Sequence, residues 1–468
     1  MPPFLALLLT FALIIYLFRR DAEENANVTS ALWVPLIWLM IVGSRAVSQW
    51  LWACGIHGFG AVTVEEGSPI DALVVFILIV LGVRILVRRN ISFWEFARRN
   101  KWIVLYLAYC FISIAWSELP FVALKRWIKI LGHPIMVLVV LTEPDPKAAV
   151  IRLMQRCAYV IVPLSITLIK YFPNVGREYD PFTGAAMNSG VTIHKNLLGC
   201  DSMILECFFF WRWLSVRQME KTPERRRELI LIAAFGCMIG WLFNRTHSST
   251  SLGAFAVGIL VMLALGLPNL NREKVGVYAL VFLVVAGLSE WMFGISSMVI
   301  QLLGRDPTLT GRVFIWQETL ALQPNALLGA GFESFWLGDR LAKMWELHWW
   351  HPNEAHNGYL ETYLSLGAIG LALLLGAIVV AFRHAKDWLV NDFEQGRFRL
   401  GFLAAIVVYN WTEAAFKGLS FIFFMFYVVA ISYRSPAIQS VGEASELEAA
   451  DDDDLVDEHN PAIRVRPI

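Results

Sequence analysis

Apolar stretches long enough to cross a lipid bilayer as helices recur from one end of this 468-residue chain to the other. A helix needs about 20 mostly apolar residues to span the hydrocarbon core. Stretches of this kind are found near residues 3–18, 31–53, 70–87, 102–117, 121–141, 151–172, 196–213, 229–243, 252–267, 275–293, 357–382, 399–412 and 418–433. We therefore expect an all-α, polytopic integral membrane protein with about 12–13 transmembrane helices.

The overall composition agrees with a membrane protein and excludes several other classes. Hydrophobic residues make up 57% of the chain and charged residues 17%, whereas soluble proteins carry about 45–50% and about 25%. The formal net charge is zero, so we expect no nucleic-acid partner. The six cysteines are scattered, lie mostly in apolar runs and lack CxxC spacing. They predict neither a disulfide framework nor a metal site, and we expect no cofactor.

The basic residues of the short connections predict an orientation. Lys and Arg concentrate in cytoplasmic loops, and here the basic connections alternate correctly with poorly charged ones. They lie at residues 19–20, 88–101, 217–228, 271–274 and 383–399. This places the N-terminus outside, the C-terminus inside, and residues 294–356 outside as one large external loop. The first run lacks a basic start or a signal-peptide cleavage site, so it is predicted to be a span.

Three regions follow from this organisation. Residues 1–189 form N-terminal transmembrane helices, and residues 190–433 form a second membrane domain that contains the external loop 294–356. Residues 434–468 form a tail whose acidic run "GEASELEAADDDDLVDEH" is poor in aromatic residues. Such composition predicts a disordered, cytoplasmic segment. The chain shows no long internal repeat, which argues against the transporter folds that are built from repeats.

Several predicted outer boundaries are polar and cationic. Six of the nine histidines lie on or near the predicted outer side, as do the polar strings at residues 193–196, 244–251 and 310–318. Cations on that face indicate an anionic ligand. Arg312 is the first candidate because a guanidinium matches phosphate or carboxylate oxygens and stays charged. The glycines of "LLGAGFESFW", residues 327–336, suit a tight turn near a ligand or a helix end.

The string "HPNEAHNGYLETYLSLGAIG", residues 351–370, places His356, Asn357 and Glu361 at the start of an apolar run. An imidazole titrates near neutral pH and can act as a general base. Asn357 and Glu361 are four residues apart, so they share a helix face and can bond each other or a sugar. From spacing alone, a helix-capping role for His356 and Asn357 is as well supported as a catalytic role.

Two further readings of ionisable residues stay open. His348, His351 and His356 are close in sequence, but their spacing matches no standard zinc pattern. Asp201 and Glu206 lie inside the predicted span 196–213, where ionisable groups often face a cavity or a proton path. We predict no metal site and no pump from these residues.

Taken together, five strings resemble the O-antigen ligase and polysaccharide polymerase family, most closely its exopolysaccharide-production type. They are "GVTIHKNLLG" (190–199), "THSSTSL" (246–252), "GRVFIWQETL" (311–320), "GAGFESFW" (329–336) and "AHNGYLETYLSLGAIG" (355–370). In the last string, His356-Asn357, nine residues and then Gly367-x-x-Gly370 fit the family's pattern. The resemblance covers about residues 190–433 by motif.

The resemblance implies a fold like that of lipid-linked glycosyltransferases and a reaction at the outer face of the bacterial inner membrane. The donor would be a glycan on undecaprenyl diphosphate, and the acceptor a glycan or a second lipid-linked molecule. Arg312 resembles the loop arginine that binds the donor diphosphate, and His356 the histidine that acts as base or positions the acceptor. The substrate-binding residues predicted from the strings are Lys195, His194, Asn196, Arg245, Asn357, Glu361 and Trp316.

One departure from the family pattern concerns the string "THSSTSL". Many relatives carry Arg or Lys directly after its serine, where this chain has Ser249. Arg245, His247 or Lys195 is then the candidate for that charge.

Three functions remain open at this level. A glycan polymerase, which we favour for exopolysaccharide biosynthesis, differs from an O-antigen ligase only in using a lipid-linked repeat unit instead of lipid A core as acceptor. A transporter or flippase of lipid-linked sugars is the second class. A non-catalytic scaffold that binds partners through the external loop is the third.

Overall fold

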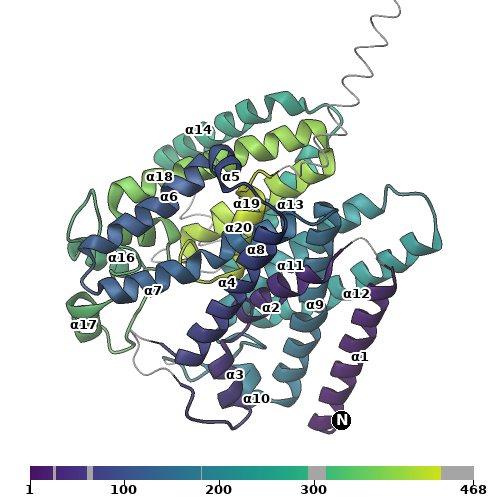
Figure 1. Ribbon diagram of the computed structural model, residues 1–468, viewed down its shortest axis with the longest axis horizontal. Helices are drawn as coiled ribbons and strands as arrows, with labels where there is room; N and C mark the ends of the chain where they lie inside the picture. Colours follow the sequence, from purple (N-terminus) through teal and green to yellow (C-terminus); the bar gives the residue numbers. More distant parts are fainter. Residues whose placement is uncertain (25–27, 61–66, 181, 294–311, 434–468) are drawn as a thin grey trace, which may run out of the picture. The chain divides into compact units, whose positions relative to one another are not determined.

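The computed structural model describes residues 1–24, 28–60, 67–180, 182–293 and 312–433, and these are almost entirely helical (Figure 1). All elements below belong to one compact unit, Met1–Ile431. The all-α, multi-pass membrane class predicted from the sequence is therefore confirmed. The acidic tail, residues 434–468, and the first part of the predicted external loop, residues 294–311, lie outside the described residues. The predicted disorder of the tail stays a prediction.

The N-terminal elements are α1 (Pro3–Glu24), η1 (Ser30–Leu32), α2 (Trp33–Val42), α3 (Val47–Ala53), α4 (Pro69–Arg88), α5 (Phe93–Arg99), α6 (Lys101–Ile112), η2 (Ser113–Trp116), α7 (Pro120–Ile130), α8 (Gly132–Leu141), α9 (Pro146–Tyr171) and α10 (Pro173–Gly176). Next comes an antiparallel hairpin of β1 (Arg177–Tyr179) and β2 (Ala186–Asn188), in which Arg177 pairs with Asn188.

The second half contains α11 (Lys195–Val216), α12 (Pro223–Thr246), α13 (Ser249–Leu265), η3 (Arg272–Lys274), α14 (Val275–Phe293), α16 (Arg312–Ala321), α17 (Gly338–Leu347), α18 (Gly358–Asn391), α19 (Phe393–Thr412) and α20 (Phe421–Ala430).

Capping residues in the sequence fix where several helices begin. The side chains of Asp145, Thr222, Asp392 and Ser420 accept hydrogen bonds from backbone N–H groups in the first turns of α9, α12, α19 and α20. Each bond satisfies an amide that has no partner within its helix, which contributes about 1 kcal/mol. Proline follows the capping residue in α9 and α12, where its missing N–H costs nothing.

Among the described residues, six helices are long and apolar enough to cross a membrane. They are α1, α4, α9, α12, α18 and η3 joined to α14. Helices η1/α2 and α3 pass the same test as a pair bent by 63°, which gives seven. The predicted number of about thirteen is higher, because several of the remaining apolar runs form shorter helices.

Two predicted spans show why hydropathy overcounts. The run 121–141 divides at Leu131 into two helices. The first, α7, carries Lys125, Arg126 and Lys129, and the second, α8, is apolar except for the buried His133. The run 418–433 contains only the ten-residue α20, and all ten of its side chains are buried inside the protein. A helix that is hydrophobic on every side can be enclosed by protein instead of lipid.

The second half of the chain packs around α19. Helix α13 packs against both α19 and α11, and α18 packs against both α19 and α6. Helix α11 also packs against α12. Glycines permit the closest of these approaches. A methyl group added at Gly401 of α19 would meet the Met262 side chain of α13 at 2.5 Å. At the end of α19, a methyl group added at Gly358, the first residue of α18, would lie 2.2 Å from the side-chain oxygen of Asn410.

Helix α18 is broken near its start. Gly367 has φ 65° and ψ −167°, a conformation that residues with a Cβ rarely adopt. The backbone of the preceding loop fills the break: the amides of Ala330 and Gly331 donate to the carbonyls of Leu364 and Ser365 at 3.0 and 2.8 Å. The glycines of residues 327–336 therefore serve a close backbone approach, as their sequence predicts.

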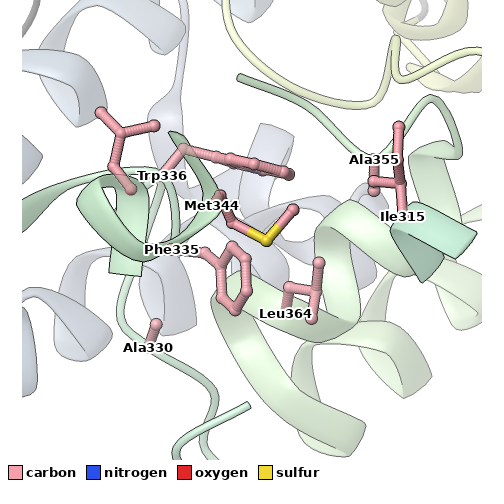
Figure 2. Close-up of a cluster of buried hydrophobic side chains, with 8 residues drawn as sticks. Ile315, Ala330, Phe335, Trp336, Met344, Ala355 and Leu364 are labelled. Atoms are coloured by element: carbon pink, nitrogen blue, oxygen red, sulfur yellow. The ribbon is translucent and has the colours of Figure 1, made fainter. Parts of the chain in front are cut away.

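A buried apolar cluster ties this loop to the flanking helices (Figure 2). It contains Ile315, Ala330, Phe335, Trp336, Leu341, Met344, Ala355 and Leu364. Its members come from α16, the glycine loop, α17, the segment before α18, and α18 itself. Burying side chains of this size contributes about 1.5–3 kcal/mol each. The cluster thus fixes the segment that carries His356 relative to α16, which begins at Arg312.

Candidate functional site

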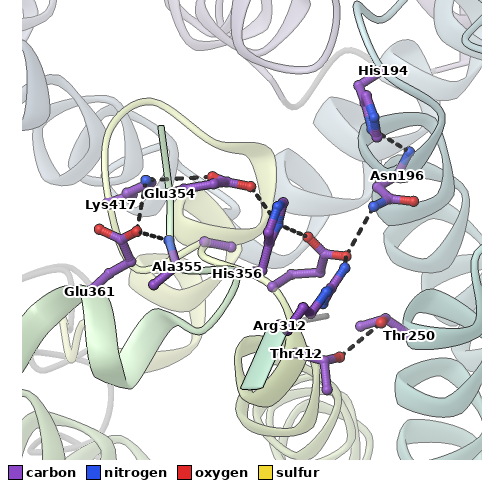
Figure 3. A network of polar contacts seen from close by, with 12 residues as sticks. His194, Asn196, Thr250, Arg312, Glu354, Ala355, His356, Glu361, Thr412 and Lys417 are labelled. Carbon is purple, nitrogen blue, oxygen red and sulfur yellow. Dashed lines mark hydrogen bonds and ion pairs between the residues drawn. The ribbon is translucent and has the colours of Figure 1, made fainter. Parts of the chain in front are cut away.

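Glu413, directly after α19, joins three residues of the predicted site (Figure 3). One carboxylate oxygen, Oε1, contacts a guanidinium nitrogen of Arg312 at 2.8 Å and accepts a hydrogen bond from the amide of Asn196 at 3.0 Å. The other oxygen, Oε2, lies 3.5 Å from Nδ1 of His356. One buried carboxylate therefore brings together the starts of α11 and α16, the segment before α18 and the end of α19.

A second group of charges adjoins the first through His356. Its Nδ1 lies 2.8 Å from Glu354, whose other oxygen is 3.4 Å from the ammonium of Lys417. Lys417 also lies 3.3 Å from Glu361, the first acidic residue of α18. Figure 3 shows this chain of contacts running from Glu361 through Lys417 and Glu354 to His356.

The charges of this network balance. Three cationic side chains, Arg312, His356 and Lys417, face three carboxylates; Glu413 and Glu361 are buried, while Glu354 is partly exposed. Ionised groups removed from water are stable only when they are paired and hydrogen-bonded. Glu361 satisfies this with two further donors, the indole N–H of Trp336 at 3.0 Å and the amide of Ala355 at 2.5 Å.

The pairing shifts the ionisation of the groups outside the membrane-spanning helices. Burial favours the neutral imidazole of His356, but Glu354 and Glu413 outweigh it and raise the pKa of His356 to about 9. Burial likewise favours neutral Glu354, but Lys417 and His356 hold the pKa of Glu354 well below its usual range. Lys417 has a raised pKa because Glu361 and Glu354 outweigh its desolvation. His356 is therefore a cation at neutral pH in this state.

Local backbone geometry explains the His-Asn pair. Asn357 is the N-cap of α18, and its side-chain oxygen accepts from the amides of Tyr359 and Leu360, both at 3.0 Å. His356, immediately before it, has φ 50°. A left-handed backbone at a non-glycine residue costs about 1–2 kcal/mol. The surrounding contacts stabilise this conformation, which directs the imidazole toward Glu354 and Glu413.

The sequence of this chain is similar to those of known proteins. Residues 232–375 match the model of the O-antigen ligase family. This confirms the resemblance expected from the sequence strings, and the matched segment contains Arg312 and His356. The string at 190–199 and the connection that carries Glu413 lie outside it.

Two curated relatives extend the similarity beyond the matched segment. The chain is 26% identical over 289 residues to the exopolysaccharide production protein ExoQ of Rhizobium meliloti (strain 1021), which covers 60% of this chain and 64% of that protein. It is 22% identical over 343 residues to a protein of Rickettsia felis (strain ATCC VR-1525 / URRWXCal2) that is provisionally named a polysaccharide ligase, covering 70% of this chain and 77% of that protein. The chain thus spans just under two thirds of the length of the first relative.

The structure brings together most residues predicted from the O-antigen ligase strings. Arg312, His356 and Asn196 meet at Glu413, and Glu361 joins through Lys417. His194 lies beside them as the N-cap of α11, where its Nδ1 accepts from the amide of Asn196 at 3.2 Å. Lys195 follows as the first residue of that helix. Their roles toward a substrate stay predictions.

Four predicted residues have partners within the protein that explain their positions. The indole of Trp316 donates to the carbonyl of Ala355 at 2.7 Å and so positions the segment before His356. Arg245 is exposed at the end of α12, with its guanidinium over the ring of Trp241. The side chains of Asn357 and Glu361 do not bond each other, since the first caps α18 and the second contacts Lys417.

The alternative metal reading changes in the structure. His348 contacts Glu318 at 2.5 Å and His351 stacks against Trp345, so neither accompanies His356. The donor atoms of Glu354, His356 and Glu413 instead lie within 4.8 Å of one another, close enough to hold a metal ion. Arg312 and Lys417 already neutralise these two carboxylates. This fit is poor for a cation, and we assign no metal here.

Sequence reasoning missed Glu413 and Lys417. Both belong to "TEAAFKGLS", a connection between the last two apolar runs. The available signal was two ionisable residues in a very short connection on the predicted outer side, where polar groups beside a span are costly unless they are paired. Asn196, Arg312 and His356 could be predicted from the sequence strings, but Glu413, the carboxylate that they contact, could not.

Proposed function

We propose that this chain is a membrane glycosyltransferase that joins glycan repeat units delivered on undecaprenyl diphosphate. The observation that carries the proposal is the convergence of Arg312, Asn196 and His356 on the buried carboxylate of Glu413. The family match and the relatives named for exopolysaccharide production and polysaccharide ligation support it. An anion-binding cation and a titratable pair in one cluster are what transfer from a diphosphate requires.

Arg312 binds the donor diphosphate in this proposal. Without substrate, its guanidinium is held by Glu413 at 2.8 Å and is mostly buried. A phosphate oxygen can replace the carboxylate because both offer the same planar match to a guanidinium. Glu413 thus keeps Arg312 paired until the donor arrives. Lys195 is the first residue of α11 and directly precedes Asn196, which contacts Glu413. In this proposal its ammonium group adds a second positive charge toward the diphosphate.

His356 positions the acceptor hydroxyl. Because its pKa is about 9, the imidazole is protonated at neutral pH and donates hydrogen bonds instead of accepting a proton. Glu413, released from Arg312 by the diphosphate, takes the hydroxyl proton. The acceptor oxygen then bonds to the anomeric carbon of the donor sugar. The bond from that carbon to the phosphate oxygen breaks, and undecaprenyl diphosphate leaves with its charge stabilised by Arg312.

The reaction is placed at the outer face of the bacterial inner membrane. The residues of the cluster lie in connections that the loop charges predict to be external, such as 413–417, or, for Asn196 and Glu361, at the outer ends of the adjoining predicted spans. A lipid carrier holds the donor at this boundary, and fixing both substrates there supplies proximity. The partners are the lipid-linked glycan donor, a glycan or lipid-linked acceptor, and membrane lipid.

We favour a polymerase, which uses a lipid-linked repeat unit as acceptor, because the relative ExoQ is named for exopolysaccharide production. The relative named for polysaccharide ligation keeps a ligase as the second candidate. The two differ in product. Loss of a polymerase leaves single repeat units, whereas loss of a ligase leaves complete polymer on its carrier lipid.

The test replaces Arg312 and His356 separately with Ala in cells that lack the native gene. Arg383→Ala is the matched control, since Arg383 is exposed on the distal part of α18. Surface polysaccharide is analysed on gels after the membrane level of each variant is confirmed. We expect loss of high-molecular-weight product in both variants but not in the control. Normal polymer from both variants would exclude the proposed mechanism.

A further inference from the structure

Three exposed aromatic side chains from distant parts of the sequence meet at one place. The ring of Phe182 lies 5.0 Å from Trp349 and 5.3 Å from Trp350, and the two tryptophans are 6.1 Å apart. Phe182 belongs to the hairpin connection between β1 and β2, and the tryptophans follow α17. We call Phe182, Trp349 and Trp350 the aromatic cluster.

Both segments that form the aromatic cluster also lead to the charged site. After the hairpin, the chain enters α11 at His194 and Asn196, which contacts Glu413. Trp350 precedes His356 by six residues, a distance of about 20 Å at most for an extended chain. The same two segments are therefore bridged twice, by polar contacts at Glu413 and by rings at the aromatic cluster.

The rings of the aromatic cluster are neither core nor typical membrane anchors. Phe182 and Trp349 keep 60% and 62% of their surface exposed, and Trp350 keeps 36%. Their surroundings are polar: Asp180 accepts from the amide of Phe182 at 2.9 Å, and Trp350 stacks on His348, which pairs with Glu318. Contiguous exposed apolar surface in such a setting usually marks a binding site.

The indole N–H groups give an independent indication of a ligand. Trp316, Trp336 and Trp345 each donate to a protein acceptor. Within the part of the chain that the structure describes, neither Trp349 nor Trp350 has an acceptor for its indole N–H. A tryptophan in contact with a partner normally uses both its ring and this donor. The cluster thus offers exposed ring faces together with two free donors.

We propose that the aromatic cluster binds the glycan of the lipid-linked substrate beside the site that holds its diphosphate. This inference rests on the proposed function. A sugar ring presents an apolar C–H face and polar hydroxyl edges, which match an aromatic face flanked by N–H donors. A lipid tail would not use the indole donors. A phosphate group would require a cation, whereas the carboxylate of Asp180 lies beside Phe182, and His348 already pairs with Glu318.

The cluster also assigns a direction to the substrate. The diphosphate lies at Arg312, and the sugars attached to it extend toward the aromatic cluster, where the hairpin connection meets the residues that follow α17. Stacking on these rings holds the growing glycan close to the reacting end. Loss of the rings is therefore expected to weaken retention of the glycan without removing the chemistry at Glu413.

The experiment uses the full-length protein in its own membranes and the double variant Phe182→Ala/Trp350→Ala. Trp94→Ala is the matched control, because Trp94 is 72% exposed on α5, on a connection predicted to face the cytoplasm. Oligosaccharide released by mild acid from the cell's own lipid-linked pool serves as a competing ligand. We expect the concentration that halves product formation to rise about tenfold in the double variant. We also expect a shorter modal product length, with Trp94→Ala unchanged.

Two additional measurements separate the possible outcomes. Trp350→Phe keeps a ring and is expected to recover part of the product length, which a purely structural defect at this position would not predict. Repeating the assay in detergent tests for membrane anchoring; a defect of the double variant that is present in membranes and absent in detergent would overturn glycan binding in favour of an interfacial anchor. Unchanged product length and competition in the double variant, while Arg312→Ala abolishes product, would refute this inference alone. Normal product from Arg312→Ala and His356→Ala would refute the proposed function itself.

Discussion

The pKa of His356 gives the sharpest test of the site, and Glu413→Gln is the perturbation. Raising that pKa from 6.5 to about 9 corresponds to about 3 kcal/mol in favour of the charged ring, at about 1.36 kcal/mol per pKa unit. Two carboxylates share this effect. Glu354 lies at 2.8 Å and Glu413 at 3.5 Å, so we assign the smaller part, about 1–1.5 kcal/mol, to Glu413. Removing its charge should lower the pKa of His356 by about one unit.

The sign of the effect on stability follows from the raised pKa. A group whose pKa is higher in the folded state stabilises it fully below the unfolded value, here 6.5, and loses this contribution as pH rises toward about 9. In Glu413→Gln, the loss should be complete about one pH unit lower.

The assay measures product formation in membrane vesicles from pH 6 to 10 together with the melting temperature in detergent. Glu346→Gln is the control, since Glu346 is exposed on α17 and has no ion pair among the described residues. We expect Glu413→Gln to lose most of its activity, because glutamine cannot take the hydroxyl proton, and the alkaline decline of its melting temperature to move to lower pH; the control should show neither change. An unchanged alkaline decline of the melting temperature would refute the assigned charge coupling between Glu413 and His356.

Three further substitutions test the supports of the site through the melting temperature and the yield of folded protein. Gly367→Ala should cost more than about 3 kcal/mol, because its Cβ would lie 2.1 Å from the carbonyl oxygen of Leu327 at a positive φ. The control Gly240→Ala, with nothing within 4 Å of the added methyl group, should be neutral or slightly stabilising. Equal effects of the two substitutions would contradict this account. Asn357→Ala should cost about 1 kcal/mol through loss of the α18 cap, whereas Asn357→Asp should retain it; a loss as large in the Asp variant would argue against capping. Lys417→Met should cost about 3–5 kcal/mol at neutral pH, because it leaves the buried Glu361 without a cation and Glu354 with His356 alone. This deficit should shrink as acid protonates the carboxylates, and a deficit independent of pH would exclude this cause.

Residues whose roles are set by the local backbone could be identified from the sequence. Asn357 lies directly before an apolar run and caps the helix that the run forms. The glycines of residues 327–336 predict a tight turn near a helix end, and the structure places them against the start of α18, although the break of that helix at Gly367 is not evident from the sequence. Each of these assignments depends on neighbours within a few residues, so one sequence contains the information.

The number of spans could not be predicted with the same success. Hydropathy measures transfer out of water and does not distinguish lipid from protein surroundings. The buried helices α8 and α20 are as apolar as true spans, although each has only ten residues. Conversely, α11 and α19 have 22 and 20 residues but contain ionisable side chains. Some of these are paired inside the protein, such as Arg212 with Glu228.

Glu413 shows why the centre of the site was the hardest part to predict. Its partners, Asn196, Arg312 and His356, are separated from it by 217, 101 and 57 residues. Nothing in the connection that follows α19 predicts that three distant segments end beside it. The motif residues alone would give three polar groups near a membrane boundary, each compatible with a capping or surface role. A single buried carboxylate that contacts all three makes their positions interdependent, so a substitution at Glu413 should affect the anion-binding arginine and the histidine together.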